Sequence, residues 1–174
     1  MFPSGDRYNG TWNGKWIEGF GVYDFVKQNL QYRGEFKRSQ PHGRGTLLRK
    51  PVNSSQREDV IYEGEWMNGL KEGLGKYVYF KDTFYDGNWV KNCKEGHGTF
   101  KSPEGEFVGE WRNDKKNGKG ILKLYNGHVF QGKWEEDQFV GGTVTFSNGD
   151  RYDGELVNQN RHGFGTYSYK NNNT

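Results

Sequence analysis

The chain has 174 residues, with 25 basic and 22 acidic side chains and a formal net charge of +3. This even balance names no class of partner, and no apolar run approaches the roughly 18–20 residues that a membrane-spanning helix needs. Hydrophobic residues make up only 31%, as in disordered segments, but aromatic residues reach 17%. Because each aromatic side chain can bury roughly 150–250 Å², regularly placed aromatics argue against disorder.

One sequence pattern occurs seven times along the chain. An aromatic residue is followed by glycine two positions later, by a bulky apolar residue four positions later, and by glycines eleven and thirteen positions later. The copies begin at Tyr8, Tyr32, Tyr62, Tyr85, Phe107, Phe130 and Tyr152. A period of about 23 residues is typical of one supersecondary unit stacked repeatedly, which favours a binding surface over a deep active-site cleft. We therefore expect residues 1–174 to form a single repeat array.

Two copies depart from this spacing. The step from copy two to copy three contains an extra polar stretch, Lys50–Val60, which we predict to be a mobile insertion that can be removed without loss of the fold. Copy six has Gly141 and Gly142 adjacent, with Thr143 where the last glycine is due. A one-residue deletion that compresses Gly-x-Gly to Gly-Gly explains this copy.

Each copy is predicted to be a β-hairpin. Segments such as Tyr62–Trp66 alternate bulky and polar residues, which is the period of a strand. We expect about seven residues of turn, and then a second strand that begins at the last glycine, as at Gly75. Asn126–Gly127 and Asn148–Gly149 are turn signals between hairpins. The predicted fold is all-β: an elongated, twisted, single-layer antiparallel sheet of about fourteen short strands, with an aromatic and glycine-rich groove.

The leading aromatic residue, the glycine after it and the tryptophan-type residue project to one face of this sheet. Some of that aromatic surface is expected to stay uncovered in the groove, where it can bind a partner. The candidate partner-binding residues are Tyr62, Trp66, Tyr85, Trp89, Phe107, Trp111, Phe130 and Trp134. The alternative is that these aromatics are simply the core.

The segment EGEWMNGLKEGLGKY, from Glu63 to Tyr77, resembles the MORN (membrane occupation and recognition nexus) repeat. The resemblance implies a groove-bearing stack of hairpins without catalysis by the repeats themselves. Members of the family serve as cytoskeletal, ciliary and membrane-associated scaffolds, or as appendages to lipid kinases and SET-domain methyltransferases. Phe2–Arg7 looks like the end of a preceding copy, which favours a segment of a longer array. Leu156 departs from the usual aromatic of the pattern.

The sequence contains no grouping of residues that indicates an enzyme, a metal site or a cofactor site. The four histidines belong to four different copies, so they are not expected to converge on one ion. The Gly-x-Gly strings lack the Lys-Ser/Thr of a phosphate-binding loop. Since Cys93 is the single cysteine, it has no internal disulfide partner, and a reducing cytoplasmic setting is expected.

Charge gives limited support to a membrane or a nucleic acid as partner. Among the turns that follow the tryptophan-type residues, the most basic adjacent pair is Val90–Glu95 with Arg112–Asn117, which carries +3. At about 1 kcal/mol per basic residue, this gives only roughly millimolar affinity for an anionic bilayer. No stripe of basic residues accompanies the aromatics, so no nucleic acid is expected.

The leading interpretation is a non-enzymatic scaffold whose groove binds a helical or extended protein segment in a cytoskeletal or ciliary assembly. Two alternatives stay open: a phospholipid-binding membrane tether, and the repeat portion of a larger enzyme. Unpaired terminal strands invite pairing, so we also expect a homodimer through Gly163–Tyr169, weakened by Tyr167→Lys.

Overall fold

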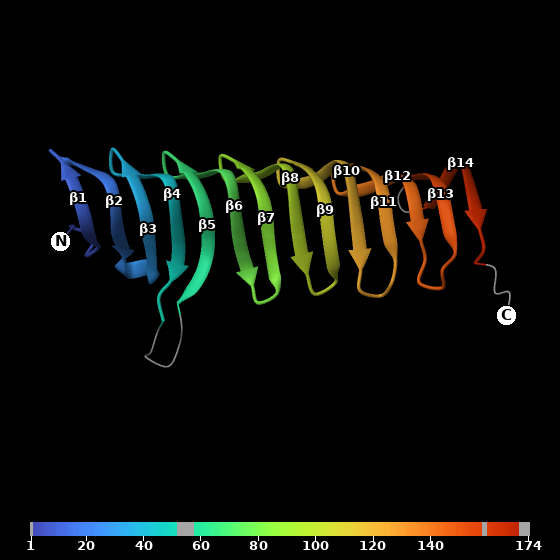
Figure 1. Cartoon of the computed structure of the whole chain (residues 1–174), viewed down its shortest axis with the longest axis horizontal. Coiled ribbons are helices and arrows are strands. Elements are labelled where there is room, and N and C mark those ends of the chain that lie inside the picture. The colour runs from blue at the N-terminus through green and yellow to red at the C-terminus, as the bar shows by residue number, and fades with distance from the viewer. Residues whose placement is uncertain (1, 52–57, 158–159, 171–174) are drawn as a thin grey trace. The chain divides into compact units, whose positions relative to one another are not determined.

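The computed structural model describes residues 2–51, 58–157 and 160–170. Within these residues fourteen strands are hydrogen-bonded in chain order, from β1 to β14, and neighbouring strands run antiparallel (Figure 1). This confirms the predicted all-β fold of tandem hairpins.

The chain divides into two compact units. The N-terminal unit comprises the chain up to Lys81 together with Asn88–Asn92, and the C-terminal unit comprises Asp82–Gly87 and the chain from Cys93 onward. The first contains β1 (Arg7–Asn13), β2 (Trp16–Phe25), the short 3-10 turn η1 (Val26–Gln28), β3 (Leu30–Lys37), β4 (Gln40–Arg49), β5 (Asp59–Met67) and β6 (Leu70–Phe80). The second contains β8 (Cys93–Ser102), β9 (Gly105–Arg112), β10 (Lys115–Leu124), β11 (Val129–Glu135), β12 (Gln138–Thr145), β13 (Arg151–Val157) and β14 (Asn160–Ser168). Strand β7 (Thr83–Val90) contributes residues to both units.

The turn inside each hairpin is much tighter than predicted. In copy three, β5 ends at Met67 and β6 begins at Leu70, so the turn is two residues rather than about seven. Both turn residues, Asn68 and Gly69, have positive φ angles, of 50° and 78°. This is the pattern of a type I′ turn, which suits the right-handed twist of a hairpin. The prediction that the second strand begins at Gly75 was therefore wrong.

The glycine at position eleven forms a bulge inside the second strand rather than part of a loop. Gly64 pairs with Gly75, but the next residue, Glu65, pairs with Glu72, so two residues of β6 bulge out of the ladder. One of these, Gly73, has a φ of +62°, and an added Cβ there would collide with the Glu65 carboxylate. The bulge explains why the alternation is lost in the segment that was read as a turn.

Aromatic side chains and glycines interlock within and between copies. In copy three the Tyr62 ring lies over Gly64 and Gly75, and its hydroxyl donates a 3.0 Å hydrogen bond to the carbonyl of Glu65. The Trp66 ring meets Tyr62 edge-on, with centroids 5.0 Å apart. Its indole Nε1 donates a 3.0 Å hydrogen bond to the carbonyl of Gly45, in the preceding copy.

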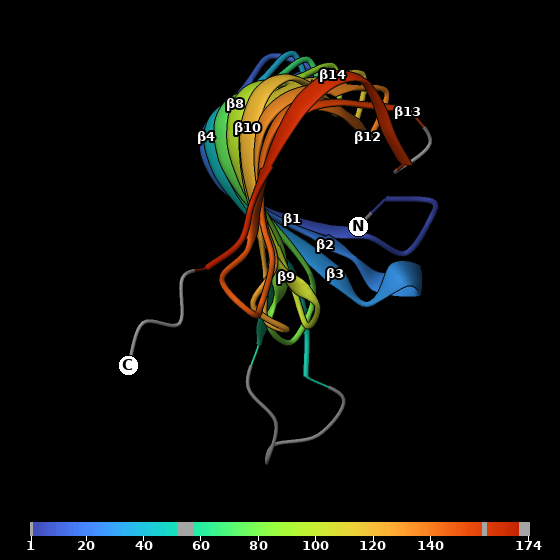
Figure 2. The ribbon, with the colours of Figure 1, turned by 90° about the vertical axis from the view of Figure 1, so that its right-hand side faces the viewer.

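The same contact recurs in the C-terminal unit. Trp111 Nε1 donates to the carbonyl of Gly98, and Trp134 Nε1 donates to that of Gly120, each at 3.2 Å. An aromatic pair and a net hydrogen bond are each worth about 0.5–1.5 kcal/mol, so each of these tryptophans adds a small increment of stability between neighbouring copies. Figure 2 shows the strands of this unit, β8, β10 and β14 among them, strongly bent along their length.

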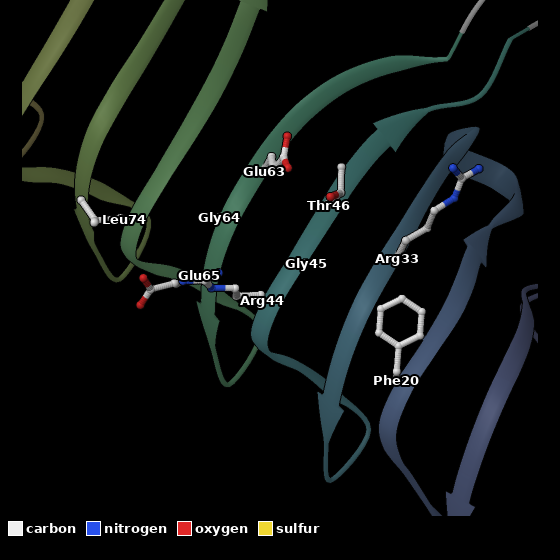
Figure 3. Close-up of a pocket in the computed structure, with 9 residues that line it drawn as sticks. All are labelled: Phe20, Arg33, Arg44, Gly45, Thr46, Glu63, Gly64, Glu65 and Leu74. Atoms are coloured by element: carbon white, nitrogen blue, oxygen red, sulfur yellow. The ribbon is translucent and has the colours of Figure 1, made fainter.

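The residue between the glycines at positions eleven and thirteen projects from the face opposite to the aromatic residues. In the N-terminal unit these residues include Phe20 and Leu74, which are 67% and 60% exposed. They bracket a hollow of about 470 Å³, with charged side chains such as Arg44 and Glu63 between them (Figure 3). Both signs of charge are present there, so this hollow has no strong electrostatic preference.

The insertion predicted at Lys50–Val60 is shorter than expected. Its last two residues, Asp59 and Val60, belong to β5 and pair with β4. Residues 52–57 lie outside the described residues, so the prediction of mobility is untested. At the near end, the Lys50 backbone N–H donates a 3.0 Å hydrogen bond to the Asn29 carbonyl.

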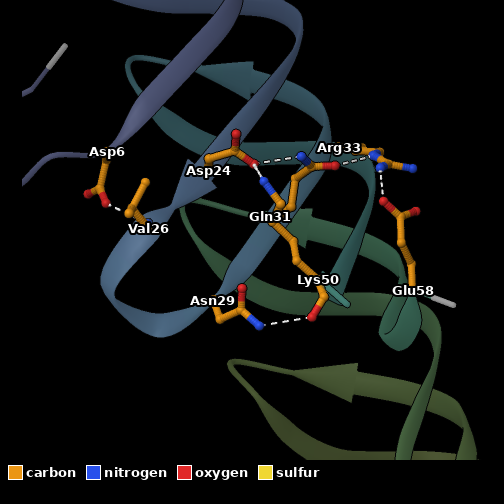
Figure 4. A network of polar contacts seen from close by, with 8 residues as sticks. All are labelled: Asp6, Asp24, Val26, Asn29, Gln31, Arg33, Lys50 and Glu58. Carbon is orange, nitrogen blue, oxygen red and sulfur yellow. Dashed lines mark hydrogen bonds and ion pairs between the residues drawn. The ribbon is translucent and has the colours of Figure 1, made fainter. Parts of the chain in front are cut away.

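Charged contacts fix both ends of this insertion (Figure 4). Lys50 Nζ lies 3.2 Å from an Asp24 carboxylate oxygen, and Arg33 forms an ion pair with Glu58. Partial burial acts to raise the pKa of Asp24, but a hydrogen bond from Gln31 and the pairing with Lys50 bring it below its ordinary value. The insertion therefore leaves and enters the sheet at defined points.

Candidate functional site

Most of the predicted groove residues are core residues. Tyr62, Tyr85, Trp89, Phe107, Trp111 and Trp134 are all buried, with no more than 4% exposed. Trp66 and Phe130 are half-buried. A partner can reach the buried rings only past the side chains that surround them, so their role in binding stays a prediction. The available surface comes from other positions.

Residues of the second strands supply much of that surface. Tyr77 pairs with Tyr62, and Leu122 pairs with Phe107, so these side chains share the face of the leading aromatics. Both are half-buried rather than buried. The alternation after the last glycine could have identified them, because it places every second residue on the aromatic face.

A cation lies on the aromatic face five residues after the tryptophan-type position in several copies. In the N-terminal unit, Lys71 Nζ lies 4.0 Å from the centroid of the Trp89 ring. In the C-terminal unit, Lys94 lies 4.3 Å from Trp111 and Lys116 lies 4.8 Å from Trp134. These distances are within the range of cation–π attraction. The predicted seven-residue turn concealed these lysines, because it assigned them to a loop.

Burial affects the protonation of two of these lysines. Desolvation lowers the pKa of Lys94 and of Lys116 below the ordinary lysine value, since the charged form loses contact with water. The nearby carboxylate of Asp137 acts in the opposite direction on Lys116 and does not cancel the effect. Arg161 takes the corresponding place in copy seven, with its guanidinium 5.3 Å from the Tyr167 ring centroid.

The aromatic face of the C-terminal unit contains a cavity of about 890 Å³ that extends from β10 to β14. Its apolar floor includes Leu122, Leu124, Phe130, Phe139, Val144 and Phe146. Lys116 and Asp137 lie at the β10 side, and Arg161 lies on β14. The volume is in the usual range of ligand pockets, which is about 300–1,000 Å³.

The deletion in copy six changes the floor of this cavity. Lys133 pairs with Gly141 and Trp134 pairs with Phe139, so the bulge has lost one residue. In copy six the glycine pair is Gly132 with Gly142, and an added Cβ on Gly132 would meet backbone atoms of Gly141 and Gly142. In copy five the equivalent pair, Gly109 with Gly120, is covered by the Phe107 ring. Phe130 instead packs edge-on against Phe139, with ring centroids 5.6 Å apart.

Neither a metal-binding group nor a membrane-spanning helix is found in the described part of the chain. Over these residues no group of three or more His, Cys, Asp or Glu side chains could hold a metal ion. None of its helices is both long and apolar enough to cross a membrane.

The comparisons with known proteins agree with the repeat pattern. The model of the MORN repeat matches residues 8–29, 32–50, 62–83, 85–106, 107–129 and 152–174. Between the last two segments lies copy six, the one with the shortened bulge. The chain is also 34% identical over 76 residues to MORN repeat-containing protein 3 of Xenopus laevis. That stretch is 44% of this chain and 32% of the relative.

Six matched segments that begin at the observed copies account for most of the sequence. The hairpins, the bulge glycines and the interlocked aromatics are built on the same residues that the family model matches. The chain belongs to the MORN repeat family.

Proposed function

We propose that this protein is a non-enzymatic scaffold that binds a protein segment on the aromatic face of its repeats, within a cytoskeletal or ciliary assembly. The observation that carries the proposal is the cavity of the C-terminal unit, whose apolar floor is open to a partner. Uncovered apolar surface of this kind often marks an interaction site. A scaffold role is consistent with the MORN repeat family.

A phospholipid-binding tether is the second candidate. The observation in its favour is the presence of Lys94, Lys116 and Arg161 on the aromatic face, where they could meet an anionic headgroup. A third possibility is the repeat portion of a larger enzyme, which a mass measurement of the native product would test.

A photo-crosslinking experiment tests the leading proposal. A photoreactive amino acid is placed at Leu124, which lines the cavity, and in a control at Lys119, which lies on the opposite face of the same strand. The proposal expects protein crosslinks at Leu124 that are absent at Lys119. Pelleting with phosphatidylserine vesicles, without protein crosslinks at Leu124, would instead favour the tether.

We also propose that two copies associate through the β14 edge. Phe164 and Tyr169, on and just after this strand, are 97% and 77% exposed. The strand ends the sheet within the described residues, and an unpaired edge promotes pairing. Sedimentation should show a dimer at micromolar concentration that Tyr167→Lys weakens. A monomer at every accessible concentration would contradict this.

A further inference from the structure

The strands that form the floor of the cavity in the C-terminal unit already use their backbone groups in hydrogen bonds to neighbouring strands. This floor lies mainly on β10, β11 and β12, and each of these strands is paired on both sides. An extended peptide lying across these strands would find no backbone donors or acceptors, and its own would be left unpaired against an apolar floor. An α-helix satisfies its backbone internally and needs only an apolar face for contact.

Two cations mark the ends of the same cavity. Lys116 is on β10 and Arg161 is on β14, four strand spacings apart. At about 4.8 Å per spacing, their strands are separated by roughly 19 Å. A helix rises 1.5 Å per residue and has 3.6 residues per turn, so two residues 14 apart lie roughly 21 Å apart on one side of the helix and match this separation.

Neither cation is neutralised by an ion pair within the described residues. Lys116 rests on the rings of Phe107 and Trp134, and Arg161 rests on those of Tyr152 and Tyr167. The one carboxylate that lines the cavity, Asp137, accepts a 2.9 Å hydrogen bond from the backbone N–H of Lys116. With two cations and one carboxylate, the lining has a charge of +1, which is complementary to an acidic partner.

The irregular copy adds an anchor position to this surface. Because the shortened bulge takes Phe130 away from the glycine pair, the ring stays half-buried and contributes to the floor between the two cations. A bulky apolar side chain at the centre of a helix can pack on it. A single lipid headgroup is too small to reach cations roughly 19 Å apart, and the surface between them is apolar.

We infer that this cavity binds an acidic amphipathic helix, which places a bulky apolar residue against Phe130 and pairs two carboxylates 14 residues apart, on one side of the helix, with Lys116 and Arg161. The inference rests on the proposed function and names the partner class of the same surface. It assigns the two cations the role of setting the charge and the register of the bound segment.

The test uses three synthetic 20-residue helical peptides with one identical apolar face. The first has Glu at positions 4 and 18, the second has Lys at these positions, and the third has its two Glu residues only 7 apart, on the same side of the helix. Binding to the full chain is measured by fluorescence anisotropy. The first peptide should bind about tenfold or more tightly than either of the others, since each opposed or misplaced charge weakens the contact.

Charge exchange provides a readout that a purely structural role would not give. In the double variant Lys116→Glu with Arg161→Glu, the preference should reverse, so that the peptide with Lys binds more tightly than the peptide with Glu. The matched control is Lys119→Glu, a change of the same charge on an exposed residue of the same strand, which should leave the preference unchanged. Thermal unfolding of each variant checks that it is folded. Should the double variant fail to fold, Lys116→Gln and Arg161→Gln replace it, and the preference should then disappear.

Equal binding of all three peptides, or a preference that persists after charge exchange, would overturn the inference. Binding of phosphatidylserine vesicles together with no binding of any peptide would also overturn it. If the peptides fail while crosslinks to a protein still form at Leu124, only this inference falls and the proposed scaffold function stands.

Discussion

Copies five and six are neighbours in the C-terminal unit, and a difference of one residue in the second strand separates their structures. In copy five two residues bulge out of β10, and the Phe107 ring covers Gly109 and Gly120. In copy six one residue bulges out of β12, and Phe130 packs against Phe139 instead. Both copies lead with phenylalanine. The comparison teaches that the length of the bulge, rather than the identity of the leading aromatic, decides whether that ring covers its glycine pair.

We expect the largest effect on stability from substitutions of glycines in these two copies. In Gly120→Ala the new methyl group would collide with the Phe107 ring, whereas in Gly141→Ala it would make ordinary contacts at 3.4 Å and beyond. We expect Gly120→Ala to lower the free energy of unfolding by about 1–3 kcal/mol, and Gly141→Ala by much less. Urea denaturation of the two variants measures this. Equal losses would show that Gly141, which lies beside the Gly132–Gly142 pair, is packed as tightly as Gly120.

Restoring the missing residue sharpens the same comparison. Inserting one residue between Gly141 and Gly142 recreates the Gly-x-Gly of copy five, and we expect Phe130 to move over its glycine pair and leave the cavity floor. The acidic peptide should then bind about tenfold more weakly, a loss of about 1.4 kcal/mol. Anisotropy with the first peptide tests this. A matched control inserts one residue after Asn126, in the turn between β10 and β11, and should leave binding unchanged.

A smaller effect on the free energy of unfolding, which depends on pH, is expected from the leading tyrosines of the N-terminal unit. Burial, reinforced by the nearby charge of Glu65, raises the pKa of Tyr62 well above the ordinary value of 10.0. The unfolded chain therefore loses this proton first, so the contribution of Tyr62 to stability should be constant below pH 10 and decrease as the pH rises beyond it.

Tyr62→Phe removes this titration together with the hydrogen bond to the Glu65 carbonyl. We expect it to cost about 1 kcal/mol at neutral pH and to reduce the loss of stability above pH 10. Urea denaturation at pH 7 and at pH 10.5 measures both effects. An unchanged pH dependence would mean that Tyr62 ionises alike in both states. Phe107, which leads copy five without a hydroxyl, shows that the position itself accepts phenylalanine.

The smallest expected effect concerns the insertion between β4 and β5. Replacing residues 52–57 by a two-residue linker, with Lys50 and Glu58 kept, should change the free energy of unfolding by less than about 1 kcal/mol, because loop closure depends weakly on length. Chemical denaturation against the unmodified chain measures this. A collapse of the fold in the shortened chain would show that the insertion takes part in the packing.

The sequence determined the hairpin architecture because its cause is local. The period of about 23 residues and the alternation in segments such as Tyr62–Trp66 define strands, their order and the face on which the aromatics lie. The one-residue deletion at Gly141–Gly142 was also visible in the sequence. The two-residue turns were signalled only in part: Asn68–Gly69 is an Asn-Gly pair, whereas pairs such as Lys91–Asn92 and Glu136–Asp137 adopt positive φ without that signal.

Only the tertiary structure decided which aromatic residues are buried and where the cations lie. Tyr85 and Trp111 have the pattern of a groove residue, but each is covered by side chains from neighbouring copies, which no single copy reveals. Lys116 is in a segment without alternation, and the bulge beside it places its ammonium group on the rings of Phe107 and Trp134. The cavity depends on the pairing of five strands, and for that reason it belongs to the stacked copies rather than to any one repeat.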